Sequence, residues 1–129
     1  MKKKILLADD SPSVRRVISM SLEMEGYEVE SVCNGEEALQ KLAISHPDVL
    51  ITDISMPKMN GRELCHSIHN EYPERQFRIY VITANVGRDE REWVSQISNI
   101  DFLEKPVSPR RLQSQLADYF ADGETQSGR

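Results

Sequence analysis

Five short apolar runs recur along the chain, and each is followed by a segment whose apolar positions have helical spacing. Strands and helices that alternate in this way form a parallel sheet with helices on both faces. Parallel strands covered on both faces read as nearly continuous apolar runs, as 5–8 and 49–51 do here. The pattern therefore predicts an α/β fold. The expected strands lie at 5–7, 29–32, 49–51, 79–82 and 102–103.

Polar residues at the starts of the helical segments predict where the helices begin. Side-chain oxygens at these positions accept hydrogen bonds from backbone N–H groups that have no partner inside the helix. Gly26 stands where the first helix should end. Two pairs have the spacing of a capping box, Asn34 with Glu37 and Asn60 with Glu63, and Ser108 is the expected N-cap before Pro109.

The last helical segment closes the domain. Leu112, Leu116 and Tyr119 have the spacing of a core-facing stripe, and the pattern does not continue into the polar segment 122–129. Two glycines and no apolar anchor in that segment favour disorder. We therefore expect one domain over 1–121 and a disordered polar tail over 122–129.

Composition narrows the classes of function. The 129 residues carry a formal net charge of −5, and 39% are hydrophobic and 29% charged, as in a globular domain. A negative net charge argues against direct nucleic-acid binding. No apolar run reaches the roughly 18 residues of a membrane helix, and no signal-peptide core follows Met1. We expect a cytoplasmic protein without membrane contact, in which Cys33 and Cys65 are reduced thiols.

Charged and hydroxyl side chains stand where four of the expected strands end. Ligands of doubly wound sheets bind at the carboxyl ends of the strands, so these groups should share one site. Clustered carboxylates repel each other unless a cation joins them, and a few hard oxygen ligands suit Mg²⁺. A carboxylate is also a nucleophile toward phosphoryl groups, which points to phosphoryl chemistry. The residues are Asp9 and Asp10 after the first strand, Asp53 after the third, Thr83 after the fourth and Lys105 after the fifth.

Five motifs, in this order along the chain, resemble those of the receiver domain of response regulators, the family of the bacterial chemotaxis regulator. The resemblance covers roughly residues 3 to 120. It implies a flavodoxin-like five-stranded parallel sheet of order 2-1-3-4-5 with five helices on both faces. It also implies a signalling switch that catalyses only its own phosphorylation and dephosphorylation. The motifs are Ala8-Asp9-Asp10-Ser11, Asp53-Ile54-Ser55-Met56-Pro57, Asn60-Gly61, Thr83-Ala84 and Phe102-Leu103-Glu104-Lys105-Pro106.

The resemblance implies a role for each residue near the acidic group. Asp53 would be the phosphoacceptor, supplied by a phosphohistidine of a sensor histidine kinase or of a histidine phosphotransfer protein. Asp10 and Asp53 would ligate Mg²⁺ directly, together with the backbone carbonyl of Ser55. Asp9 would lie nearby and act mostly through water. Lys105 would bind phosphoryl oxygens.

The resemblance also implies how the signal leaves the site. Thr83 and Phe102 would form a switch pair, and the Lys105–Pro106 peptide bond would be cis. Phosphorylation would then change the surface made by the fourth helix, the fifth strand and the fifth helix. A downstream effector protein, or an output domain missing from this sequence, would read that surface.

The first helix carries two apolar edges. Val14, Ile18 and Leu22 form the expected core stripe. The second edge is either part of a broad core face or an exposed docking surface. The resemblance implies that a kinase packs on this helix, and exposed methionines suit an adaptable surface. The second edge consists of Val17, Met20 and Met24.

Three other classes of protein fit the residues less well. A flavodoxin-type electron carrier would need a phosphate loop rich in glycine and hydroxyl groups where Asp9 and Asp10 stand. A haloacid-dehalogenase-type phosphatase would need an acid at position 55, which is serine. A receiver that serves only as an interaction module would have lost an acid or the lysine, and none is lost. One departure from the family is the segment 98–101, which lacks the Gly-Ala that many members carry before Phe102.

Overall fold

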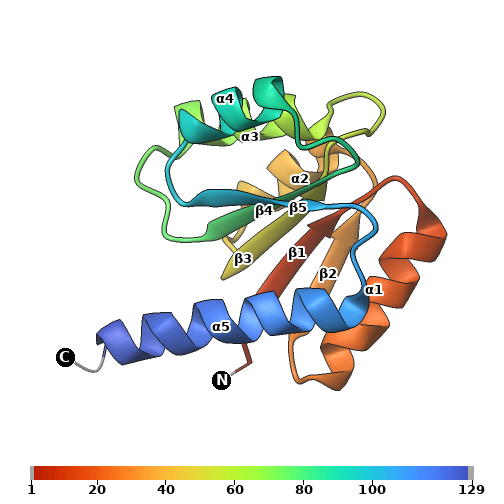
Figure 1. The fold of residues 1–129 in the computed structure, drawn as a ribbon, viewed down its shortest axis with the longest axis vertical. Helices are drawn as coiled ribbons and strands as arrows, with labels where there is room; N and C mark the ends of the chain where they lie inside the picture. Colours follow the sequence, from red (N-terminus) through yellow and green to blue (C-terminus); the bar gives the residue numbers. More distant parts are fainter. Residues whose placement is uncertain (1, 128–129) are drawn as a thin grey trace.

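The computed structural model describes residues 2–127 and contains one five-stranded parallel sheet flanked by helices (Figure 1). The strands lie in the order 2-1-3-4-5, so the predicted fold is confirmed. Along the chain the elements are β1 (Lys4–Ala8), α1 (Pro12–Met24), β2 (Glu28–Val32), α2 (Gly35–Leu42), β3 (Val49–Asp53), α3 (Gly61–Glu71), β4 (Arg78–Thr83), α4 (Arg88–Ser95), β5 (Ile100–Glu104) and α5 (Pro109–Ser127).

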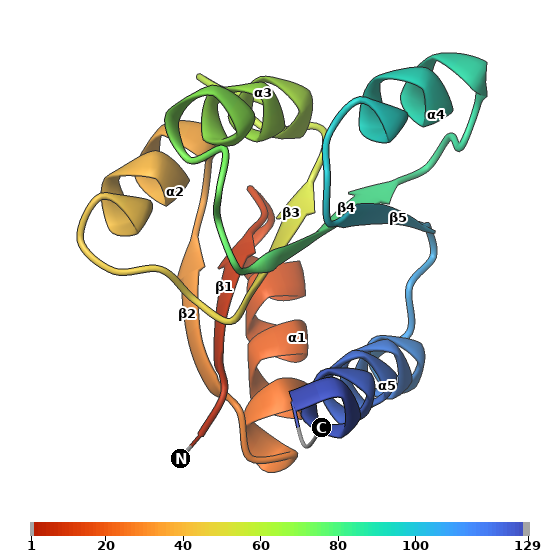
Figure 2. The ribbon, with the colours of Figure 1, turned by 90° about the vertical axis from the view of Figure 1, so that its left-hand side faces the viewer.

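Two apolar layers flank the sheet, because successive side chains of a strand point to opposite faces. In β1, Ile5 and Leu7 pack with residues of α1 and α5, whereas Leu6 and Ala8 pack with residues of α2 and α3. Figure 2 shows this division, with α1 and α5 on one face of the sheet and α2, α3 and α4 on the other. These four β1 side chains are at most 3% exposed, which is why the strand reads as a continuous apolar run.

The caps of the middle helices follow the predicted pattern with one exception. At α3, Asn60 accepts a hydrogen bond from the Glu63 N–H at 2.8 Å and donates its own N–H to the Glu63 carboxylate at 3.0 Å, a complete capping box. At α2, Asn34 caps the helix, but Glu37 accepts from the N–H of Cys33 at 2.9 Å. The capping box predicted at α2 was therefore wrong. The Cys33 thiol also donates to Glu37, at 3.2 Å, so two donors hold the carboxylate away from the Asn34 N–H.

The core stripe predicted for α1 is shorter than expected. Ile18 and Leu22 are buried, but Val14 is 38% exposed. Val14 lies in the first turn of the helix, where it lines a hollow at the ends of the strands instead of facing the sheet. At its other end, α1 stops as predicted, and Gly26 has a φ of 97°, a conformation that glycine adopts without strain.

The C-terminal helix is longer than its apolar pattern predicts. α5 begins as expected, with the Ser108 hydroxyl accepting a hydrogen bond from the N–H of the third helical residue at 3.1 Å. Its backbone stays helical to Ser127. Extending a helix costs less free energy than starting one, because each residue added to a formed helix also adds a hydrogen bond. The division into a domain over 1–121 and a disordered tail over 122–129 stays a prediction, and residues 128–129 lie outside the described residues.

The segment 98–101 turns without glycine because Asn99 takes its place. Asn99 has a φ of 53°, which asparagine tolerates better than most residues. Its carbonyl oxygen accepts from the Ile79 N–H at 3.1 Å and from the Arg75 guanidinium at 3.0 Å. Its side-chain oxygen accepts from Arg78 at 3.2 Å. The loop that leads into β5 is thus anchored to β4 and to the segment before it.

Candidate functional site

Three carboxylates meet at the carboxyl ends of the strands. One carboxylate oxygen from each of Asp9, Asp10 and Asp53 lies within 4.8 Å of the others. Asp9 and Asp53 are buried, and Asp10 is exposed. The three acids open onto a hollow of about 570 Å³. The hollow is lined by Asp9, Asp10, Ser11, Val14, Ile18, Asp53, Ile82, Lys105, Pro106 and Val107.

The register of the sheet brings the two buried acids together. Ala8 of β1 is paired with Thr52 of β3, so the next residues, Asp9 and Asp53, leave the sheet side by side. The Asp9 carboxylate accepts a hydrogen bond from the Ser11 N–H at 2.9 Å. The Asp53 carboxylate accepts one from the N–H of the residue that follows it, at 2.9 Å. Each acid is therefore held by the loop that begins at its own strand.

Lys105 supplies the positive charge of the site. Its ammonium Nζ lies 3.0 Å from Asp53 Oδ1, and the two side chains are 41% and 5% exposed. Its backbone N–H donates to the Thr83 carbonyl at 2.8 Å, which fixes the chain where β5 ends. The Lys105–Pro106 peptide bond is cis. One face of the ion pair is open to the hollow, where an incoming oxyanion can reach the ammonium.

The electrostatics of the acidic group favour a bound cation. Burial raises the pKa of Asp9 above its ordinary value, and the neighbouring carboxylates of Asp53 and Asp10 raise this pKa further. The hydrogen bond from Ser11 and the charge of Lys105 oppose these effects but do not reverse them. A cation among the three carboxylates would remove the repulsion, and an all-oxygen donor set of this size suits Mg²⁺. The residues present thus fit a magnesium site.

Thr83 and Phe102 lie on neighbouring strands and on the same face of the sheet. Phe102 is paired with Val81, two residues before Thr83, and its half-buried ring packs on the core under α3 and α4. The buried Thr83 hydroxyl donates to the carbonyl of Asn85 at 3.2 Å and accepts from the Asn85 N–H at 3.1 Å. Thr83 is therefore bound to its own loop in this structure.

The start of α3 packs against the backbone of β3 and of the loop that follows it. A Cβ atom at Gly61 would come within 2.3 Å of the Asp53 carbonyl oxygen, so only glycine fits there. The Gly61 N–H donates to the Ile54 carbonyl at 2.9 Å, which closes the loop. Ser55 is exposed within this loop, two residues after Asp53.

One residue at the site was missed in the sequence. Arg15 of α1 donates from Nη1 to the backbone carbonyl oxygen of Asp9 at 2.7 Å. The only signal for it is a basic residue six positions after Asp9, and many helices carry such a residue for solubility. The contact depends on the angle at which α1 leaves the sheet, which local sequence patterns do not give.

The second apolar edge of α1 is exposed. Val17 is 56% exposed, Met20 54% and Met24 85%. The edge starts beside Val14 at the mouth of the hollow and runs along the helix. Of the two alternatives left open by the sequence, the structure favours an exposed apolar surface over a broad core face.

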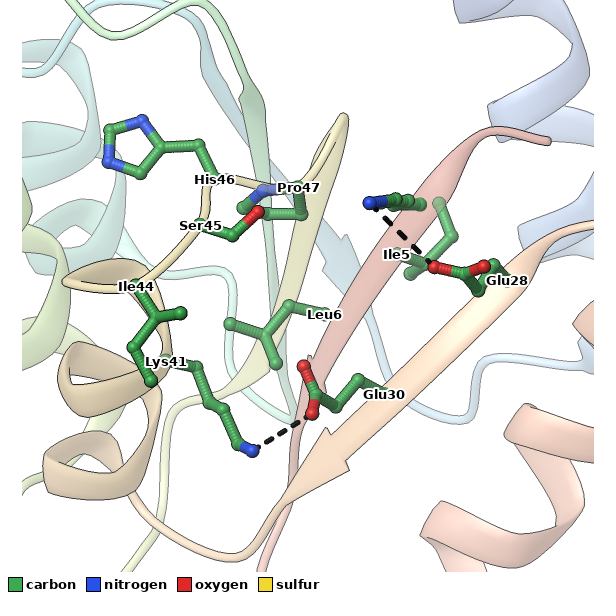
Figure 3. A pocket seen from close by; sticks show the side chains of 10 residues that line it. Ile5, Leu6, Glu28, Glu30, Lys41, Ile44, Ser45, His46 and Pro47 are labelled. Carbon is green, nitrogen blue, oxygen red and sulfur yellow. Dashed lines mark ion pairs between the residues drawn. The ribbon is translucent and has the colours of Figure 1, made fainter. Parts of the chain in front are cut away.

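A second hollow lies at the opposite end of the strands, between β2 and the end of α2 (Figure 3). Its charged side chains pair with one another, as in the contact of Lys41 with Glu30 at 2.9 Å. Lys4 lies 4.0 Å from Glu28 in the same way. Within residues 2–127, no cluster of three carboxylates like that at the carboxyl ends is found at this hollow.

None of the helices in the described part of the chain is long and apolar enough to cross a membrane.

The chain is similar to known signalling proteins along most of its length. Residues 5–117 match the family model described as the response regulator receiver domain. A probable transcriptional regulator, ycf27, of Cyanophora paradoxa is 35% identical over 115 residues, which are 89% of this chain and 47% of the relative. PhoP of Bacillus subtilis, an alkaline phosphatase synthesis transcriptional regulatory protein, is 32% identical over 116 residues, or 90% of this chain and 48% of PhoP. The chain spans about half the length of the curated relatives it matches.

Solved structures with the same fold cover nearly the whole chain. The chemotaxis response regulator CheY4 of Vibrio cholerae superposes with a TM-score of 0.83 and 30% identity, over 92% of this chain and 98% of CheY4. A CheY-like receiver domain protein of Methanospirillum hungatei superposes with a TM-score of 0.87 and 26% identity, over 98% and 99% of the two chains.

Proposed function

This chain belongs to the response regulator receiver domains, the phosphoacceptors of two-component signalling, and from that membership we propose that Asp53 accepts the phosphoryl group. A receiver domain is a signalling switch and not a classical enzyme. The observation that carries the assignment to Asp53 is its place among three acids and one lysine: it is the buried acid that pairs with Lys105 at 3.0 Å.

The chemistry is the transfer of a phosphoryl group between two side chains. An oxygen of the Asp53 carboxylate attacks the phosphorus of a phosphohistidine, the new O–P bond forms as the P–N bond breaks, and the imidazole leaves. Mg²⁺, when bound, neutralises charge on the carboxylate and on the phosphoryl oxygens. Asp10, Asp53 and the backbone carbonyl of Ser55 would hold it directly, with Asp9 acting mostly through water. Lys105 moves its ammonium from the Asp53 carboxylate to a phosphoryl oxygen.

The switch begins at Thr83. A hydrogen bond to a charged phosphoryl oxygen contributes about 1.5–3 kcal/mol, more than the roughly 0.5–1.5 kcal/mol of a neutral bond such as those to Asn85. The strength of this charged bond is of the same order as the roughly 1–3 kcal/mol of typical allosteric coupling. As Thr83 turns toward Asp53, space opens on its face of the sheet, and Phe102 rotates into it. The surface of α4, β5 and α5 then changes shape.

This scheme needs two kinds of partner, a protein that donates the phosphoryl group and a protein or domain that responds to it. Membership of the family implies a cognate histidine kinase, and we propose that the kinase or a phosphotransfer protein docks on Val17, Met20 and Met24 beside the hollow. Their exposure supports the proposal. A downstream effector protein, or an output domain outside this sequence, reads the switched surface. The receiver itself does not contact nucleic acid, in keeping with its net charge of −5.

Intact-mass spectrometry tests the phosphoacceptor. Acetyl phosphate with Mg²⁺ should add the mass of one phosphoryl group to the wild-type protein and none to Asp53→Asn. Asp118→Asn, the same substitution at an exposed position of α5, is the matched control and should be labelled like the wild type. Equal labelling of Asp53→Asn and the wild type would exclude Asp53.

A further inference from the structure

Arg15 reaches from α1 to the acidic group, although the scheme above gives it no role. Its guanidinium donates to the Asp9 carbonyl oxygen at 2.7 Å, and the residue is half-buried. That carbonyl belongs to the peptide unit that joins Asp9 to Asp10. The hydrogen bond to the carbonyl oxygen resists rotation of this unit, because the bond keeps its geometry only in one orientation.

Asp10 needs such support more than its neighbours do. The Asp9 carboxylate accepts from the Ser11 N–H, and the Asp9 N–H donates to the Val32 carbonyl at 3.1 Å. Asp10 is exposed, and no hydrogen bond or ion pair holds its side chain among the residues that the structure describes. The direction of its carboxylate therefore depends on the backbone that carries it.

The charge of Arg15 would by itself oppose a cation at the site, but Glu37 offsets it. Hydrogen bonds from Cys33 lower the pKa of Glu37, and the charges of Lys58 and Arg15 lower it further. The Arg15 and Glu37 charges therefore attract each other. The Glu37 carboxylate therefore offsets part of the repulsion between Arg15 and a cation at the site.

We propose that Arg15 is a positioning residue for the metal site: its hydrogen bond to the Asp9 carbonyl aims the Asp10 carboxylate toward Asp53 before Mg²⁺ binds. The inference rests on the proposed Mg²⁺-dependent function and adds a residue to it. Removal of a positive charge near a cation site normally strengthens cation binding. For Arg15 we expect the opposite, a loss of Mg²⁺ affinity.

The test compares Mg²⁺ affinity, measured by NMR titration of the full chain, in two variants with the same change of charge. Arg15→Met should bind Mg²⁺ more weakly by about tenfold, the lower end of the loss seen when an outer-shell hydrogen bond is removed. Arg16→Met changes the next residue of α1, which is exposed and makes no hydrogen bond or ion pair in the described part of the chain. Its affinity should stay within about twofold of the wild type, because exposed charges are screened. In the metal-free protein, the amide signals of Asp10 and Ser11 should move in Arg15→Met only.

The outcomes separate the inference from the function on which it rests. If the wild type does not bind Mg²⁺, the proposed function fails. If the wild type binds and Arg15→Met binds equally or more tightly, Arg15 acts only as a charge and the inference fails. Arg15→Lys, whose ammonium can still donate to the Asp9 carbonyl, should bind within about threefold of the wild type. Binding by Arg15→Lys as weak as that of Arg15→Met would also overturn the inference.

Discussion

The two ends of the sheet arrange their charged residues in opposite ways. At the carboxyl ends of the strands, three carboxylates gather within 4.8 Å of one another, and among the described residues only Asp53 of the three forms an ion pair, with Lys105. At the amino ends, acids and bases alternate and pair, as Lys41 does with Glu30 at 2.9 Å. Both ends contain a hollow, so a hollow alone does not distinguish them.

The difference shows which end is built for a ligand. Exposed ion pairs such as those at the amino end contribute about 0–1 kcal/mol each and need nothing further to satisfy them. Like charges held together and partly buried cost stability, unless a cation or a hydrogen-bond donor joins them. The carboxyl end therefore carries a cost that Lys105 and the Ser11 N–H reduce and that a bound cation would reduce further, which is the property of a functional site.

The largest expected effect is on Mg²⁺ affinity, when the exposed acid at the carboxyl ends of the strands is removed. Asp10→Ala should weaken Mg²⁺ binding by about 100-fold or more, since loss of an outer-shell partner alone costs up to about 100-fold. Phosphorylation by acetyl phosphate should slow in parallel. Isothermal titration with Mg²⁺ and the rate of mass gain measure the two effects. Unchanged Mg²⁺ affinity would mean that Asp10 is an ordinary surface residue and not a ligand of the metal.

The next effect separates the site from the surface that reads it. Thr83→Ala should still accept a phosphoryl group, because the carboxylates and Lys105 remain. The NMR shifts of Phe102 and α4 on addition of beryllofluoride, a phosphoryl mimic, should be largely lost, a coupling of about 1–3 kcal/mol. Thr83→Ser keeps the hydroxyl and should respond like the wild type. A full response in Thr83→Ala would place the switch elsewhere.

A smaller effect concerns the cost of the acidic group itself. Asp9→Asn keeps the oxygen that accepts from Ser11 but removes a charge, so it should stabilise the metal-free protein at neutral pH by on the order of 1 kcal/mol, the size of a typical single-residue effect. Urea unfolding measures the difference. Saturating Mg²⁺ should reduce it, because the cation binds the folded wild type.

The pH dependence gives this prediction a sign. The pKa of Asp9 is raised in the folded protein, chiefly by burial, above its ordinary value of 3.8. Protonation therefore favours the folded state, and its contribution is full below pH 3.8 and is lost as pH rises through the folded pKa. The advantage of Asp9→Asn over the wild type should be largest near neutral pH and should shrink in acid. An advantage that grows in acid would contradict the raised pKa.

The smallest effect is expected at the amino end. Glu30→Gln breaks the contact with Lys41, yet stability should change by less than about 1 kcal/mol, because both side chains are well exposed. Phosphorylation and Mg²⁺ affinity should not change. A loss of phosphorylation in this variant would show that the two ends are coupled.

The same contrast explains what could be predicted from the sequence. Parallel strands end at a common edge, so Asp9, Asp53 and Lys105 could be assigned to one site from their positions after apolar runs. The exposure of Val14 and the reach of Arg15 could not be predicted, because both depend on the angle of α1 against the sheet. The hydrogen bond from Cys33 to Glu37 likewise reflects a competition between nearby donors that spacing alone does not decide.

The most direct measurement of the central claim is the position of the phosphoryl group. The protein is phosphorylated with acetyl phosphate and Mg²⁺, and sodium borohydride then reduces the acyl phosphate of an aspartate to homoserine. Peptide mass spectrometry locates the change. Homoserine at position 53, and a greatly reduced yield when Mg²⁺ is chelated, is the result we predict. Homoserine at Asp9, at Asp10 or at an acid elsewhere in the chain would contradict the assignment of Asp53 as the phosphoacceptor.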